Sequence, residues 1–197
     1  MIKKVRRGIS LLILAFLIGF VLVLYIIKTG FHITLLVLIP SLILTVLASS
    51  YMREGFSKIS SVDGYRGGEY LFRYSALLFV SIILLSARGN YIIVYYIGVV
   101  FSVFGSVFLL LGMIFLGASF RHISKLYNVK LPRYAGILLE VSMSFSIFDI
   151  GLSLLMRVFI YYFLVLPVLI IVSLSLAYLG LRKIRDQKKE DEEVVVA

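Results

Sequence analysis

The sequence contains no cysteine among its 197 residues. That absence excludes disulfides, thiolate metal ligands and cysteine nucleophiles. The chain also lacks a Gly-x-Ser-x-Gly elbow, a Walker phosphate loop and a His-Glu-x-x-His motif. Its two histidines, His32 and His122, lie far apart, and His122 is surrounded by basic residues that disfavour a metal cation. We therefore expect neither an enzyme nor a bound cofactor, and no metal site.

Charge is scarce as well, at 15% of residues, whereas about 25% is usual in soluble domains. Hydrophobic residues make up 61% of the chain, the mean hydropathy is +1.08, and the apolar residues come in long blocks. A bilayer core about 30 Å thick needs roughly 20 such residues per helix. Backbone groups in lipid must satisfy one another, so each block predicts a helix.

The sequence thus predicts an all-α, polytopic integral membrane helical bundle with six transmembrane helices. A basic N-terminal segment covers residues 1–8, the transmembrane domain covers 9–181, and a charged tail covers 182–197. The loop 52–69 is rich in glycine and charge and is predicted to be flexible. The predicted spans are 9–27, 31–51, 70–87, 91–120, 134–156 and 158–181.

Basic residues favour one side of this arrangement. Of the 20 lysines and arginines, only Lys28, Arg88 and Arg157 fall on the side opposite the N-terminus. Because positive residues concentrate on the cytoplasmic side, this asymmetry predicts both termini in the cytoplasm. Tyrosines also gather near the predicted ends of the spans, where Tyr74 is one example, as expected of an aromatic belt. The net charge of +10 is thereby assigned to the membrane surface and not to nucleic acid.

The turn between the last two spans has two possible positions. Placing it at Arg157 leaves two spans of full length, whereas Asp149-Ile150-Gly151 has better turn chemistry but shortens the fifth helix. The sequence leaves both open.

Two carboxylates, Glu140 and Asp149, lie inside the predicted fifth span. Buried acids in membranes are costly and usually face a protein interior or a cavity. Their nine-residue spacing puts them on opposite faces of a helix, so they do not form one acid–base pair. A proton- or cation-linked pathway would use these acids with the serines beside them. Alternatively, each acid is neutralised by a nearby arginine. The candidate serines are Ser142, Ser146 and Ser153, and the candidate partners are Arg73, Arg88, Arg121 and Arg157.

Small residues recur on one face of the predicted fourth span, at Gly98, Ser102, Gly105 and Gly112. Such spacing favours a helix-packing seam.

Pro40 and Pro167 fall near the middles of the second and sixth spans and predict kinks. Broken helices form substrate sites in transporters, although single prolines are ordinary in membrane helices.

Two stretches carry a family resemblance: LGMIFLGASFRHISKLYNVK at Leu111–Lys130, and LAYLGLRKI at Leu176–Ile184. They are similar to segments of a family of uncharacterised archaeal multi-pass membrane proteins, in which a glycine-bearing span leads into a basic segment with a tyrosine and an asparagine. Tyr127-Asn128 would match that pair. The resemblance implies an archaeal cell membrane and no particular activity.

Together these features favour a non-enzymatic accessory, assembly or scaffold subunit in the cell membrane. Its expected partners are the lipid bilayer and other membrane subunits or further copies of itself. The alternative is a small transporter or channel that uses Glu140 and Asp149.

Overall fold

The computed structural model describes residues 1–29, 38–86, 92–156 and 159–196, and for 23, 26–29, 86, 92, 145–156, 159–164 and 188–196 it describes the backbone alone. These residues form six α-helices. They are α1 (Ile2–Thr29), α2 (Ile39–Ser57), α3 (Val62–Ser86), α4 (Ile92–Tyr127), α5 (Lys130–Met156) and α6 (Phe159–Val196).

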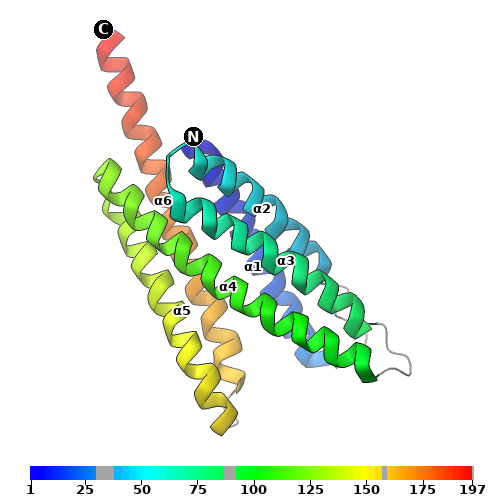
Figure 1. The fold of residues 1–197 in the computed structure, drawn as a ribbon. Helices are drawn as coiled ribbons and strands as arrows, with labels where there is room; N and C mark the ends of the chain where they lie inside the picture. The colour runs from blue at the N-terminus through cyan, green and yellow to red at the C-terminus, as the bar shows by residue number, and fades with distance from the viewer. Residues whose placement is uncertain (30–37, 87–91, 157–158, 197) are drawn as a thin grey trace.

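The helices run up and down in chain order (Figure 1). Each packs against its neighbours in the sequence, and α6 also packs against α1, which closes a ring of six helices. The figure shows α4 and α5 meeting at the end where their short connection lies and diverging toward the other end. The charged end of α6 continues as a helix beyond the rest of the bundle.

A single apolar core joins all six helices. Its members include Leu12 of α1, Phe56 of α2, Leu71 of α3 and Leu139 of α5, and the Phe56 and Phe120 rings lie 6.4 Å apart. Most of these residues belong to the half of each helix that adjoins the N-terminus, the α2–α3 turn or the α4–α5 turn. Among the side chains that the structure describes, the apolar core therefore lies mainly at that end.

Four helical segments within the described residues are long and apolar enough to cross a membrane: Ile2–Leu22, Val62–Leu85, Ile93–Tyr127 and Val165–Gln187. The chain is thus an all-α, multi-pass helical membrane protein. Of the other two predicted spans, 31–37 of the second lies outside the described residues, and for 145–156 of the fifth only the backbone is described. Six crossings therefore remain a prediction, although six helices are present.

Several boundaries differ from the predicted ones. The structure replaces the flexible loop 52–69 with two helices and a turn of four residues, 58–61. The glycines there pack against neighbours: a Cβ on Gly68 would lie 2.7 Å from Cγ of Arg53, and one on Gly55 would lie 2.5 Å from Cγ2 of Val5. Hydropathy could not foresee this, because helices continue into polar sequence once they leave hydrocarbon.

Of the two candidate positions for the turn between α5 and α6, Asp149-Ile150-Gly151 is helical, and Arg157 lies outside the described residues. The backbone of α5 is helical through Asp149, Ile150 and Gly151 and ends at Met156, and α6 begins at Phe159. The residues between them, 157–158, lie outside the described part.

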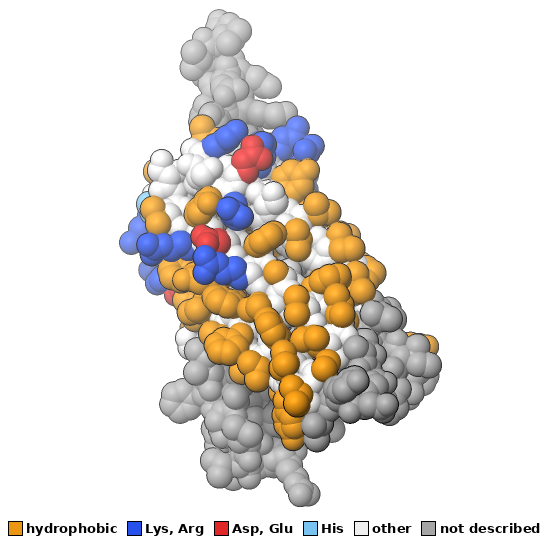
Figure 2. Space-filling view, turned by 45° about the vertical axis from the view of Figure 1, so that its right-hand side comes forward, with side chains coloured by type: hydrophobic (Ala, Val, Ile, Leu, Met, Phe, Trp, Pro, Cys, Tyr) orange, Lys and Arg blue, Asp and Glu red, His pale blue; other side chains and the backbone are white. Residues whose placement is uncertain are grey.

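Charged side chains gather over one end of the molecule, and the surface below them is dominated by hydrophobic side chains (Figure 2). We call this the basic end. It contains the start of α1, the α2–α3 turn, the α4–α5 turn and the turns of α6 that carry Arg182 and Lys183.

Candidate functional site

Glu140 of α5 forms an ion pair with Arg121 of α4. The Oε1 atom of Glu140 lies 2.8 Å from Nη2 of Arg121, and the two side chains are 20% and 47% exposed. Arg121 stands six residues before the end of α4, so the pair lies in the half of the bundle nearer the basic end. Of the two arrangements open to this acid, the described structure has neutralisation by an arginine.

Two glycines allow the helices that carry this pair to touch. A Cβ on Gly136 would lie 2.4 Å from the carbonyl oxygen of Gly117 and 2.9 Å from Cγ of Arg121. A Cβ on Gly117 would lie 2.7 Å from Cγ of Glu140. Each glycine stands four residues before the charged residue of its own helix, so the crossing is reciprocal: each glycine makes room for the opposite charged side chain.

Arg73, the other candidate partner near this end, does not pair with Glu140. It forms an ion pair with Glu69, one turn earlier on α3. Its guanidinium carbon lies 5.8 Å from the ring centre of Tyr70 and 5.9 Å from that of Phe108. Arg73 therefore acts as part of the α3–α4 packing.

The second predicted acid, Asp149, cannot be placed in a site, because its side chain lies outside the described residues. The side chains of Asp149, Ser146 and Ser153, and the whole of Arg88 and Arg157, lie outside the described residues. Ser142 is described: its hydroxyl donates to the carbonyl oxygen of Leu138, one turn back on the same helix, at 2.6 Å.

The small residues of α4 lie against α3. A Cβ on Gly98 would lie 3.0 Å from the Leu85 side chain, and one on Gly112 would lie 3.2 Å from the carbonyl oxygen of Gly67. Gly105 has more room, with its nearest neighbour at 3.7 Å. Ser102, on the same face by spacing, is partly buried. The spacing of these residues identified the packing face of α4, but only the structure shows that α3 packs against it.

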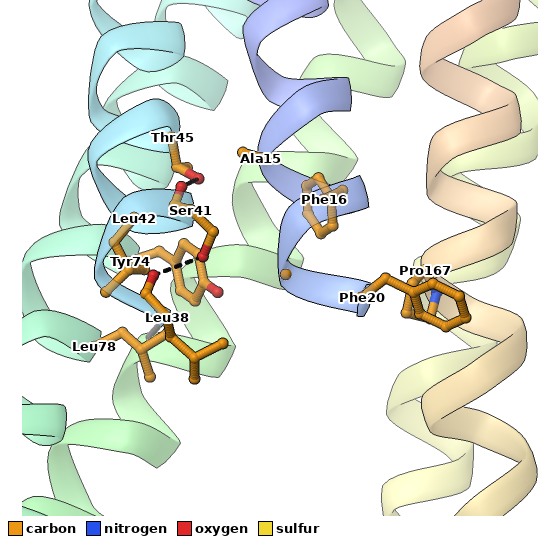
Figure 3. A pocket seen from close by; sticks show the side chains of 11 residues that line it. Ala15, Phe16, Phe20, Leu38, Ser41, Leu42, Thr45, Tyr74, Leu78 and Pro167 are labelled. Atoms are coloured by element: carbon orange, nitrogen blue, oxygen red, sulfur yellow. Dashed lines mark hydrogen bonds between the residues drawn. The ribbon is translucent and has the colours of Figure 1, made fainter. Parts of the chain in front are cut away.

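A pocket of about 240 Å³ lies inside the ring, between α1, α2, α3 and α6. Its wall is mostly apolar. The ring of Tyr74 lies beside Ser41 and Leu42, and Phe20 lies across from them beside Pro167 (Figure 3). The hydroxyls of Ser41 and Thr45 donate to carbonyl oxygens of Leu38 and Ser41, each at 2.8 Å. The pocket as described is therefore suited to an apolar group.

Sequence reasoning did not find this pocket, because its wall combines residues from four helices and no spacing along one helix reveals it. Tyr74, predicted as an interface residue, belongs to this wall. Pro167 is inside α6, as predicted, and lines the pocket. Pro40 instead occupies the first turn of α2, since that helix begins at Ile39. A proline in a first turn disturbs little, because the missing N–H would have had no helical partner.

Ion pairs at the basic end join separate helices. Lys4 of α1 pairs with Glu54 of α2, and Lys58 lies 3.6 Å from the same carboxylate. The hydrogen bond from Lys4, helped by the positive charges of Lys4 and Lys58, holds the pKa of Glu54 below its ordinary value. Arg53 donates to the hydroxyl of Tyr65 at 3.0 Å. These contacts tie α1, α2 and α3 together.

Comparisons with known proteins give no relative: no family model matches the chain, and neither a curated protein nor a solved structure matches it. They add no support to the archaeal family resemblance at Leu111–Lys130, which stays a prediction. The fold and composition establish a multi-pass helical membrane protein.

Proposed function

We propose that this protein is a non-enzymatic accessory or scaffold subunit that binds another membrane protein through the first half of α4, with both termini in the cytoplasm. The observation that carries the proposal is an exposed apolar stripe. Its members recur every three or four residues, and their exposed fractions run from 43% to 69%. They are Ile93, Tyr96, Ile97, Val100, Val103, Phe104 and Val107.

This spacing is the one that helices use to pack against one another. The opposite side of α4 is occupied by α3, through Gly98 and Gly112. Because α5 diverges from α4 along this half, the described part of the chain does not cover the stripe (Figure 1). A helix of a second membrane protein fits that geometry.

The polar side chains described inside the bundle support a structural role. Many of the buried hydroxyls, such as those of Ser75 and Ser173, donate to carbonyl oxygens of their own helices. Glu140 pairs with Arg121. Groups used in this way maintain the fold and are not free to bind a polar substrate.

The test compares two matched double variants. V103A/F104A shortens the stripe, and F79A/V80A removes the same two side-chain types from an exposed part of α3, where Phe79 is 42% and Val80 39% exposed. Each protein is purified from its native membrane in mild detergent and its complex is weighed by native mass spectrometry. We expect a partner in fixed stoichiometry, with V103A/F104A reducing its recovery about tenfold, because lost interface aromatics commonly cost that much.

F79A/V80A should retain the partner. The proposal fails if the unaltered protein carries only lipid and detergent, or if both variants lose the partner equally.

The pocket of about 240 Å³ between α1, α2, α3 and α6 favours a second candidate function, a small transporter or channel. Pro167 and the walls of four helices surround this space, and transporters often bind substrates beside interrupted helices. The described carboxylate Glu140 does not line it, so a neutral apolar solute fits better than a cation. Glu140→Gln combined with Asp149→Asn tests whether transport uses these two carboxylates. Unchanged solute or ion flux in liposomes would exclude carboxylate-coupled transport.

A further inference from the structure

A second and larger pocket, of about 680 Å³, lies at the basic end where α4 meets α5. We call it the α4–α5 pocket. Both helices and the turn between them line it, and four of the lining residues are lysine or arginine. The charged and polar residues are Arg121, His122, Ser124, Lys125, Asn128, Lys130, Arg133 and, from α3, Asp63.

The acids that the structure describes balance little of the positive charge in this pocket. Among the described lining residues, Asp63 is the only acid. Arg121 is paired with Glu140, but within the described part of the chain Lys125, Lys130 and Arg133 form no ion pair. Elsewhere at the basic end lysines and arginines do find carboxylates, as Lys4 does with Glu54. Like charges held close together repel, so this arrangement favours an anion from outside the chain.

The turn that holds these cations is well fixed. Asn128 directly follows α4 and lies in the left-handed region, with φ of 52°. The amide of Val129 donates to the carbonyl oxygen of Ser124 at 3.2 Å, and the Ser124 hydroxyl donates to the carbonyl oxygen of Val129 at 2.7 Å. Lys125 and Lys130 therefore project from a pre-formed turn. The start of α5 adds the positive end of a helix dipole.

Apolar side chains lie next to the charges. Ile137 lines the pocket and is 40% exposed, and nearby in the chain Leu126 and Tyr134 are each 57% exposed. A molecule seated here would place an anionic group on lysines and arginines and an apolar group on α4 and α5. A free phosphate would use only the first of these surfaces.

We propose that the α4–α5 pocket binds the phosphate-bearing headgroup of an anionic membrane lipid. Basic pockets between membrane helices at the cytoplasmic interface have the chemistry for such headgroups. The volume of 680 Å³ lies in the range of about 300–1,000 Å³ typical of small-molecule sites.

The test measures lipid retained by the purified protein in native mass spectrometry, using phosphatidylglycerol and phosphatidylcholine with identical chains. The pocket variant is K125Q/K130Q/R133Q. The matched control, K3Q/R7Q/K183Q, removes the same residue types and the same charge from exposed positions that do not line the pocket. We expect the unaltered protein and the control to retain phosphatidylglycerol at least tenfold better than phosphatidylcholine, and the pocket variant to lose that preference, because each basic residue near a membrane surface contributes measurably to anionic lipid binding.

Equal loss in the pocket variant and the control would overturn the proposal, since it would show a general charge effect. Displacement of the lipid by millimolar inorganic phosphate or glycerol phosphate would also overturn it, in favour of a soluble anion. Asp63→Asn gives an independent check that does not depend on the triple variant folding. Removing the acid should raise phosphatidylglycerol retention about twofold to fivefold, and unchanged or weaker retention would contradict the proposal.

Discussion

Two buried serines of α3 show that hydroxyl groups in a membrane helix can have different structural roles. Ser75 is 1% exposed and donates to the carbonyl oxygen of Leu71 in its own helix, at 2.9 Å. Ser81 is fully buried and donates across to the carbonyl oxygen of Gly98 on α4, at 2.8 Å. The first bond persists in an isolated helix. The second exists only when α3 and α4 are packed, so it contributes to tertiary stability.

Ser81→Ala should therefore destabilise the protein and Ser75→Ala should not. Interhelical hydrogen bonds in membrane proteins average about 0.6 kcal/mol, so we expect a loss of about that size for Ser81→Ala and a change near zero for Ser75→Ala. Because the chain has no tryptophan, thermal unfolding in detergent is best followed by circular dichroism. Equal midpoints for the two variants would show that the Ser81 bond adds nothing to helix packing.

Glu140 shows how much the sequence reveals about a single residue. Its position inside an apolar block marked it as costly to bury, and the predicted topology placed Arg73 and Arg121 near it as candidate partners. Distinguishing them required the crossing geometry of α4 and α5, which no spacing along one helix gives. The pair of Arg73 with Glu69 is an i, i+4 pair, a pattern that the sequence itself contains.

At the scale of elements, glycines decide where helices meet. The α4–α5 crossing depends on Gly117 and Gly136, and the α3–α4 crossing on Gly67 and Gly112. Glycine is a poor helix former by about 1 kcal/mol relative to alanine. Its presence inside these helices is explained by close backbone approach.

Gly136→Ala should test this directly. The added methyl would lie 2.4 Å from a backbone oxygen of Gly117, so the helices must separate, and overpacking of this kind costs about 1–3 kcal/mol. The matched control is Gly105→Ala, where the nearest atom is at 3.7 Å, and that variant should be neutral or gain up to about 1 kcal/mol from better helix propensity.

Both variants are compared by thermal unfolding in the same detergent. If Gly136→Ala is as stable as Gly105→Ala, the helices are not held at contact distance by the glycine. The idea that the α4–α5 crossing sets the position of Arg121 against Glu140 would then be wrong.

Hydropathy predicted the helices better than their ends. The apolar blocks anticipate the middles of α1, α4 and α5, because a helix needs about 20 apolar residues to cross a bilayer. Hydropathy missed the polar turns outside those blocks, which are the first turns of α1 and α3, the last turns of α4 and the charged end of α6. It also interpreted the glycines of 52–69 as flexibility. The α4–α5 pocket was hidden for a related reason: its basic residues are neighbours in sequence, but a pocket forms only once the turn at Asn128 folds α5 back against α4.

At the scale of the whole molecule, the two ends differ in how they are built. The basic end carries the shared core, the tightest glycine contacts and the ion pairs between helices. Toward the other end, Ile93, Tyr95 and Tyr96 of α4 are more than half exposed, and the side chains of 145–156 and 159–164 lie outside the described part. Among the described residues, the contacts that join helices therefore concentrate at the basic end, and the first half of α4 keeps an apolar face open to lipid or to another protein.

The orientation of this asymmetric bundle is open to a direct measurement, because a chain without cysteine accepts single cysteines as reporters. The positive-inside distribution predicts Ser57 and Leu126 on the cytoplasmic side and Lys28 and Asn90 outside. In intact cells a membrane-impermeant maleimide should label Lys28→Cys and Asn90→Cys, and label Ser57→Cys and Leu126→Cys only after permeabilisation. Positions 28 and 90 report on predicted external loops, and Ser57 and Leu126 lie at exposed positions of the basic end.

A complete reversal of this labelling would place the lysines and arginines outside, against the electrostatic rule, and would remove the α4–α5 pocket from the cytoplasmic leaflet. Labelling of Lys28→Cys without Asn90→Cys would instead mean that α3 and α4 do not both cross, and the six-span arrangement would have to be abandoned.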